Sequence, residues 1–142
     1  MSGAGDRTTV VVANADETVC EVLARVVEAA GHEAVRVTDA AQVSGAVLSA
    51  PAEAVVLDLG GDTADQLRDL RSGGSSRGSE VRAVVISTGP ANARLAWQAG
   101  ADAVLTRPFP AEDLHAALAD AMARGDEARA QVRADALTAL PS

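Results

Sequence analysis

The sequence has few of the residues that mark several common classes of protein. It contains a single cysteine, Cys20, so an internal disulfide and a cysteine-rich zinc site are excluded, and a reducing cytoplasm is the simplest location. No apolar run is long enough to cross a membrane. Residues 1–7 are polar and contain glycine, unlike a signal peptide, and we expect them to be disordered.

Positive charge is scarce as well. The chain has 12 Lys and Arg residues against 20 Asp and Glu residues, which gives a formal net charge of -8. This charge argues against binding to the phosphate backbone of DNA or RNA, so we expect protein partners and neither nucleic acid nor membrane. With 142 residues, 48% of them hydrophobic, the chain is long enough to form one domain with a substantial core.

Short β-branched segments alternate with segments of helical periodicity along this chain. Strands are expected at residues 8–12, 34–37, 54–57, 81–87 and 103–106, and helices at 17–30, around 43–48, at 63–71, through Leu95 and Trp97 up to Gly100, and after Pro110. Between them, residues 72–79 are rich in Gly and Ser and predict a flexible connection. Five strands alternating with five helices predict a flavodoxin-like (βα)5 fold, an α/β protein with a doubly wound parallel sheet in a three-layer α/β/α sandwich.

Polar residues follow three of the expected strands. Asp58 follows the third strand, Thr88 the fourth, and Arg107 the fifth. Because the carboxyl ends of parallel strands meet at one edge of a sheet, we expect a carboxylate, a hydroxyl group and a cation to lie together there, with Asn14 beside them. That edge is where sheets of this kind bind ligands.

Over residues 8–124 the chain resembles the receiver domains of response regulators. The resemblance is carried by Val10-Val11-Val12, Val55-Val56-Leu57-Asp58-Leu59, Val85-Ile86-Ser87-Thr88-Gly89, Gln98-Ala99-Gly100-Ala101-Asp102-Ala103 and Thr106-Arg107-Pro108-Phe109, in this order. In that family, an aspartate at the end of the third strand accepts a phosphoryl group from a histidine kinase. The resemblance implies that Asp58 is the phosphoacceptor and that Thr88 senses the phosphate. It also implies a regulatory domain of two-component signal transduction, with at most autophosphorylation at Asp58 as its chemistry.

The magnesium ligands of the family are altered in this sequence. Receivers carry two acidic residues after the first strand, and counting back from Gly31 places Asn14 and Ala15 there. Magnesium prefers an octahedron of oxygens with one or two carboxylates, so we expect weak Mg²⁺ binding at Asp58. Asp16 is a substitute ligand if the loop is shifted by one residue; otherwise it serves as an acidic residue at the start of the following helix.

The family's lysine and switch aromatic residue are also replaced. Arg107 stands in the lysine position, before Pro108 at the position of a cis-proline, and Val104 stands in the aromatic position, where valine cannot make the same rotamer change. Arginine suits two-point contact with a carboxylate, so one expectation is a permanent ion pair with Asp58. The other is that Arg107 points into solvent. These changes predict a divergent receiver that acts as a protein interaction module, with impaired or absent phosphorylation.

Two further features concern partners. Trp97 lies near the face that receivers use for partners, which makes it an interface candidate, although a Trp packed in the core or half buried is the alternative. Residues 125–142 predict a helical linker, and a narrow apolar stripe there predicts a homodimer seam. The stripe consists of Ala121, Ala128, Val132, Ala136 and Ala139. The segment 133–142 resembles the start of GGDEF diguanylate cyclase domains, which implies an output in cyclic di-GMP signalling.

Three functional hypotheses follow from these patterns. The first is the divergent interaction module described above, and the second is a phosphorylation-competent receiver that controls a diguanylate cyclase. Magnesium binding at Asp58 discriminates between these two hypotheses. The third is another flavodoxin-like ligand module, such as a cobalamin-binding domain, but the Asp-x-His-x-x-Gly loop of that family is missing from the sequence.

Overall fold

The computed structural model describes residues 8–49, 52–60, 63–72 and 81–123. Our expectations for residues 1–7, for the linker at 125–142 and for all but the first residue of the connection at 72–79 concern residues outside these ranges. Ser72, the first residue of that connection, belongs to a helix instead. Within the described ranges, no helix combines the length and the apolar content that a membrane span needs.

Five parallel strands form one sheet. They are β1 (Thr9–Asn14), β2 (Glu33–Val37), β3 (Ala54–Asp58), β4 (Arg82–Ser87) and β5 (Ala103–Thr106). The strand order is β2-β1-β3-β4-β5, with parallel pairing throughout. The chain therefore moves outward from β1 to one edge of the sheet and then returns past β1 to the other edge. This doubly wound arrangement confirms the predicted flavodoxin-like (βα)5 fold.

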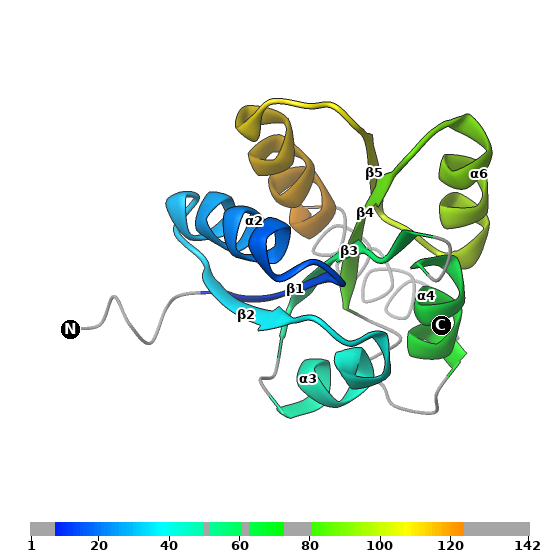
Figure 1. Ribbon diagram of the computed structural model, residues 1–142, viewed down its shortest axis with the longest axis horizontal. Helices are drawn as coiled ribbons and strands as arrows, with labels where there is room; N and C mark the ends of the chain where they lie inside the picture. Colours follow the sequence, from blue (N-terminus) through cyan, green and yellow to red (C-terminus); the bar gives the residue numbers. More distant parts are fainter. Residues whose placement is uncertain (1–7, 50–51, 61–62, 73–80, 124–142) are drawn as a thin grey trace, which may run out of the picture.

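Helices cover both faces of the sheet. The labelled helices are α2 (Glu17–Ala29), α3 (Val43–Ser49), α4 (Thr63–Ser72) and α6 (Pro90–Ala99), and a further helix spans residues 111–123. A 3-10 turn, η1 (Ala40–Gln42), precedes α3. Helix α2 and the helix at 111–123 lie on one face, and α3, α4 and α6 lie on the other (Figure 1). The three layers of the expected sandwich are therefore present.

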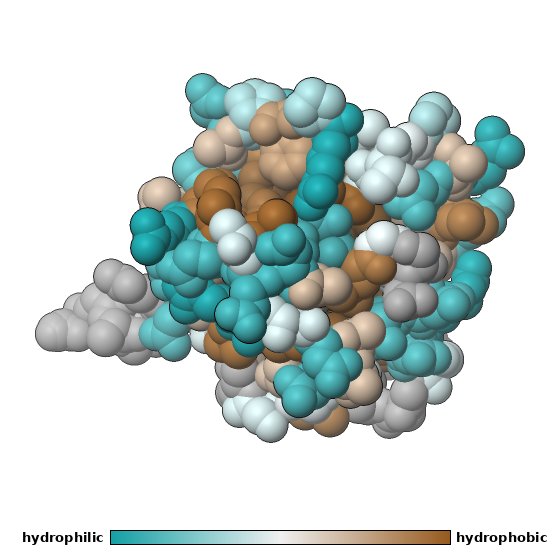
Figure 2. All heavy atoms as spheres, in the orientation of Figure 1, coloured by the Kyte–Doolittle hydropathy of each residue, from teal (hydrophilic) through white to brown (hydrophobic). Residues whose placement is uncertain are grey.

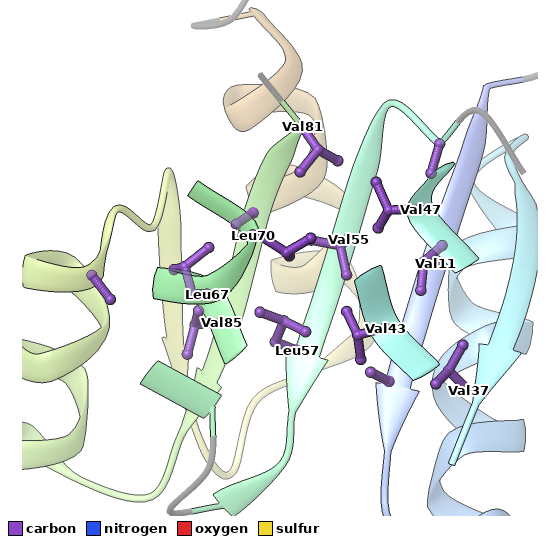
Figure 3. Packing of buried hydrophobic residues seen from close by; sticks show 14 of the residues in the cluster. Val11, Val37, Val43, Val47, Val55, Leu57, Leu67, Leu70, Val81 and Val85 are labelled. Atoms are coloured by element: carbon purple, nitrogen blue, oxygen red, sulfur yellow. The ribbon is translucent and has the colours of Figure 1, made fainter. Parts of the chain in front are cut away.

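The three central strands, β1, β3 and β4, are buried on both faces, as their continuous valine-rich sequences predicted, whereas the edge strands β2 and β5 are partly exposed. All five residues of β3 are buried. Alternate residues enter two different clusters: Val55 and Leu57 pack against α3, α4 and α6 (Figure 3), whereas Ala54 and Val56 pack against α2 and the helix at 111–123. On the molecular face seen in Figure 2, hydrophilic residues cover much of the surface, and hydrophobic residues show between them.

Cys20 belongs to the cluster under α2. Its thiol donates a hydrogen bond to the carbonyl oxygen of Val12 at 3.4 Å, and only 1% of the residue is exposed. Burial raises the pKa of the Cys20 thiol, so the reactive thiolate is disfavoured. The structure therefore makes Cys20 a small packing residue.

A cluster of charged residues joins the helices to the sheet at the edge where the strands begin. Arg71, at the end of α4, donates hydrogen bonds to the carbonyl oxygen of Gly100 at 2.9 Å and to the carboxylate of Asp102 at 3.0 Å. Asp102 also accepts from the backbone N–H of Ala83 at 2.8 Å. Gly100 ends α6 with a positive φ of 108°, and a Cβ atom there would lie 3.1 Å from the Arg71 side chain. Arg71 thus fixes the ends of α4 and α6 relative to β4 and β5.

Replacing Arg71 by methionine should lower the free energy of unfolding by about 1–3 kcal/mol, because the partly buried carboxylate of Asp102 and the carbonyl group of Gly100 lose donors. Urea denaturation measures this change. The control is Arg68→Met, which removes an exposed pair with Asp65 on the same helix and should cost less than about 0.5 kcal/mol. Equal losses in the two variants would contradict this role of Arg71.

Candidate functional site

The register of the sheet brings Asn14 and Asp58 together. They are direct partners across β1 and β3, and each is the last residue of its strand. The side-chain amide of Asn14 donates a hydrogen bond from Nδ2 to Oδ2 of Asp58 at 2.6 Å. Arg107, which follows the last residue of β5, forms an ion pair from Nη2 to the same carboxylate oxygen. Three residues that the sequence placed at one edge of the sheet therefore meet there.

Burial makes this contact important. Asp58 is 8% exposed and Asn14 is 6% exposed, whereas the side chain of Arg107 is 43% exposed. A carboxylate shielded from water in this way is unfavourable unless donors or cations compensate its charge. The structure supplies both kinds of group, and it shows Arg107 in the ion pair rather than in the solvent-directed placement.

Asn14 and Asp16 are committed to local structure. Oδ1 of Asn14 accepts a hydrogen bond from the backbone N–H of Asp16 at 2.7 Å. The carboxylate of Asp16 is the N-cap of α2 and accepts from the backbone N–H groups of Thr18 at 2.8 Å and Val19 at 3.1 Å. Of the two placements considered for Asp16, the structure shows the one that serves the start of the helix.

The described side chains at this edge offer few oxygen ligands for a magnesium ion. Asp58 contributes the only carboxylate of the three-residue contact, and its Oδ2 already accepts from an amide and a guanidinium group. Ala15 offers no side-chain ligand, and the amide oxygen of Asn14 is used by Asp16. Within the described ranges, no group of three or more His, Cys, Asp or Glu residues is arranged to hold a metal ion. Arg107 supplies the positive charge at this place.

We expected Thr88 to supply the hydroxyl group at this edge, but the hydroxyl groups that meet at the ends of β4 and β5 belong to Ser87 and Thr106. Thr88 is exposed, and its backbone N–H donates to the side-chain oxygen of Asn92 in α6 at 3.4 Å. Ser87, the last residue of β4, is fully buried, and its hydroxyl group lies 3.0 Å from that of Thr106 in β5. Ser87 and Thr106 are register partners. The sequence analysis did not single out Ser87, although the alternation of side chains along β4 places Ser87 and Thr88 on opposite faces of the sheet.

The segment after β5 adds two positions of interest. The peptide bond between Arg107 and Pro108 is cis. Val104 is partly buried and packs against the cluster under α3, α4 and α6. The position that carries an aromatic residue in receivers therefore holds an aliphatic side chain in contact with the core.

Trp97 is half exposed and borders a groove. The groove has a volume of about 450 Å³ and lies between α6 and the helix at 111–123, with β5 at its base. Its lining residues are Trp97, Asp102, Ala103, Val104, Leu105, Asp113, Ala116, Ala117 and Asp120. With 48% of its surface exposed, Trp97 is half buried, which agrees with the alternative of a half-buried packing residue and leaves its role at an interface a prediction.

Comparison with solved structures identifies proteins of the same fold. A CheY-like response regulator receiver domain protein from Methanospirillum hungatei JF-1 matches with a TM-score of 0.75 and 12% identity over 86% of this chain and 98% of the other. A sensor protein from Polaromonas sp. JS666 matches with a TM-score of 0.75 and 23% identity over 84% of this chain and 98% of the other. NtrX from Brucella abortus matches with a TM-score of 0.80 and 20% identity over 95% of this chain and 30% of that protein.

These comparisons establish the fold of the chain, which is that of CheY-like receiver domains. No protein-family model matches the sequence. No curated protein matches it either.

The strength of the Asp58–Arg107 contact can be measured by a double-mutant cycle. Arg107→Met should lower the free energy of unfolding by about 1–3 kcal/mol, because Asp58 keeps a buried negative charge without its cation. The same substitution should cost much less in an Asp58→Asn background, which gives a positive coupling energy. Arg94→Met, an exposed change on α6, is the control and should leave stability within about 0.5 kcal/mol. A coupling energy of zero would mean that the ion pair adds nothing to the fold.

Proposed function

We propose that this chain is a divergent receiver domain that serves two-component-type signal transduction as a regulatory protein interaction module, without regulated phosphorylation of Asp58. The observation that carries this proposal is the contact of Asn14 and Arg107 with the same oxygen of Asp58. The receiver fold supports the regulatory class of function. The low identities leave the chemistry of the site to be argued from its own residues.

The charge balance of the site opposes phosphorylation. In a phosphorylation-competent receiver, the carboxylate oxygen attacks phosphorus of a phosphohistidine, a P–O bond forms, the P–N bond breaks, and magnesium offsets the negative charge. Here the neutralising cation is attached to the protein at Arg107, and Ala15 leaves a gap in the ligand set. Oδ2 of Asp58 must give up two donors before it reacts or binds a metal ion. Each lost donor adds an energetic cost to the reaction.

The alternative is a phosphorylation-competent receiver that controls a diguanylate cyclase. The position of Asp58, at the carboxyl end of β3 and at the topological switch of the sheet, is the observation that favours it. The two hypotheses differ in metal binding and in modification of Asp58, so one set of experiments separates them.

Treatment with a small phosphodonor or beryllofluoride in millimolar magnesium should leave Asp58 unmodified, since the site has too few oxygen ligands for the metal ion. Intact-mass spectrometry measures phosphorylation, and magnesium titration by calorimetry measures binding. The triple variant Asn14→Asp, Ala15→Asp and Arg107→Lys should recover magnesium binding. Adding Asp58→Asn to the triple variant gives the matched control, which should lose the metal again. A stoichiometric mass increase on Asp58 of the unaltered chain would refute the proposed function.

The interaction surface belongs to the last two helices in this proposal. Trp97 of α6 and the groove next to it are the exposed features that support this placement. Partners of this class are a histidine kinase or an output domain. A homodimer through the last helix and the linker at 125–142, and a cyclase output, are the finer parts of the proposal. These parts rest on the sequence patterns of residues outside the described ranges.

Removing residues 126–142 should abolish any self-association that sedimentation detects, while circular dichroism shows an intact α/β core. The alanine-rich stripe buries little apolar area, at about 25 cal/mol per Å², so the dimer of the full chain should be weak. If the truncated chain associates as well as the full chain, the dimer seam lies elsewhere, and the surface around Trp97 becomes the next candidate.

A further inference from the structure

The last helix, at 111–123, is tied to α2 by a histidine. The two helices lie next to each other on one face of the sheet (Figure 1). Leu114 and Leu118 of the last helix are fully buried against that face. His115 is partly buried and donates a hydrogen bond from Nε2 to the carbonyl oxygen of Val26 in α2 at 2.7 Å. A side-chain hydrogen bond therefore adds to the apolar packing of the two helices.

The carbonyl group of Val26 is well placed to accept this bond. Val26 is one of the last four residues of α2, whose carbonyl groups find no donor within a regular helix. Backbone N–H groups that follow the helix reach the carbonyl groups of Val27 and Glu28. The end of α2 also carries the negative pole of the helix dipole, yet no basic residue lies in its last turn. His115 thus brings to α2, from another helix, a donor that α2 lacks.

His32 lies at the same end of α2. It follows the helix and directly precedes β2, and it is partly buried. The charged groups that act on His32 come from two other elements, His115 of the last helix and Glu53, the residue before β3. The chain contains two histidines, and the fold brings both of them to the end of α2.

Burial and charge both disfavour a proton on His32. Burial lowers the pKa of the His32 imidazole, and the positive charge of a protonated His115 lowers this pKa further. Glu53 acts in the opposite direction, but its carboxylate is exposed and its effect on the pKa is smaller than that of burial. Glu33, next to His32, is also exposed, and Glu28 in the last turn of α2 is engaged in an ion pair. The folded contact therefore favours the neutral imidazole of His32.

We propose that His32 and His115 form a proton-operated latch, in which the neutral pair holds the last helix against the final turn of α2 and proton uptake by His32 in mildly acidic solution loosens this contact. A charged His32 attracts water and repels a charged His115, and both effects favour separation of the last helix from α2. His32 lies at the edge where the strands begin, and Asp58 lies at the opposite edge. The latch is thus a regulatory device beyond the function proposed for Asp58.

The direction of the pH effect follows from proton linkage. A histidine in an unfolded chain titrates at about pH 6.5. Because the pKa of His32 is lower than this in the folded protein, the folded form binds fewer protons than the unfolded form in mild acid. The contribution of His32 to stability is complete above the unfolded value and is lost as the pH falls through the pKa of the folded form. The contact should therefore be firm in neutral solution and weaker in mild acid.

Amide hydrogen exchange of the full chain, followed by NMR at about pH 7.5 and about pH 5.5, tests the latch on either side of the usual histidine pKa. Protection factors remove the intrinsic pH dependence of exchange. For the last helix they should fall about two- to tenfold in the acidic sample, the factor that corresponds to one lost hydrogen bond. The protection factors of α6, on the other face of the sheet, should stay unchanged and serve as the internal control.

Matched substitutions separate the charge from the hydrogen bond. His32→Gln cannot take up a proton and should abolish the pH dependence, whereas Glu33→Gln, at the exposed neighbour, should keep it. His115→Leu removes the donor and should lower the protection of the last helix about two- to tenfold at both pH values. His115→Gln supplies a neutral donor and should restore this protection in neutral solution. Glu112→Gln, exposed on the same helix, is the control and should have no effect.

The ring signals of the two histidines provide a second, independent measurement. In the unaltered chain, His32 should titrate at a lower pH than a histidine in an unfolded peptide. His115→Gln should move the midpoint of His32 upward, because the second positive charge is removed.

Several outcomes overturn the latch. It is wrong if the last helix is equally protected at both pH values, if its protection falls as much in His32→Gln, or if α6 loses protection by the same factor. It is also wrong if His115→Leu leaves the last helix fully protected, or if the midpoint of His32 does not respond to His115→Gln. Modification of Asp58 by phosphodonors would overturn the proposed function alone, since none of these measurements involves that residue.

Discussion

A carboxylate buried at the end of a central strand has to be neutralised, and the way in which Asp58 is neutralised determines what this fold can do. Asp58 lies in β3, at the middle of the sheet, with β1 on one side and β4 on the other. Asn14 approaches from β1, and Arg107 approaches from the end of β5. The contact therefore joins three strands at the edge where a ligand of such a sheet would bind. The same contact engages Oδ2 of Asp58, one of the two carboxylate oxygens at that edge.

The presence of arginine at position 107 is not informative by itself. All 12 basic residues of this chain are arginines, so an arginine is expected at any position that needs a cation. The contact between Arg107 and Asp58 is the informative observation, because arginine keeps its charge and offers a planar fork to a carboxylate. A sequence comparison that scores arginine as a conservative replacement for lysine would overlook this consequence.

The strands were predictable because burial on both faces demands continuous apolar sequence, and 103–106 was found at the predicted bounds. The first strand was predicted to end at residue 12, but it continues to Asn14. Asparagine is rare in strands, and here its side chain is held by Asp58 in the neighbouring strand, a contact that local propensity does not contain. A place for Asp16 at the start of the helix was one of two predicted alternatives, and the structure adds that its carboxylate is the N-cap.

Other features depend on tertiary geometry. The sequence placed Asp58 and Arg107 at one edge, but whether the guanidinium group turns inward depends on the counter-charges that the folded sheet presents. Which of Ser87 and Thr88 is buried depends on the pleat of β4, because neighbouring residues of a strand point to opposite faces of the sheet. The groove beside Trp97 depends on the separation of two helices that are distant in sequence, and this separation is set by the packing of both on β5 and its neighbours. The spacing of apolar residues in the sequence does not predict the distance between these two helices.

An internal cation also changes how the domain can be regulated. A ligand shifts a conformational equilibrium only if it binds two states with different affinity, and phosphate has that role in a receiver. In the function that we propose, Arg107 stays on Asp58 and the input comes from a surface instead. Val104 packs against the core and also lines the groove. Valine has few accessible rotamers, so the base of the groove has a fixed shape. In the function that we propose, a preformed groove would bind its partner without a signal from Asp58, and the interaction would be constitutive.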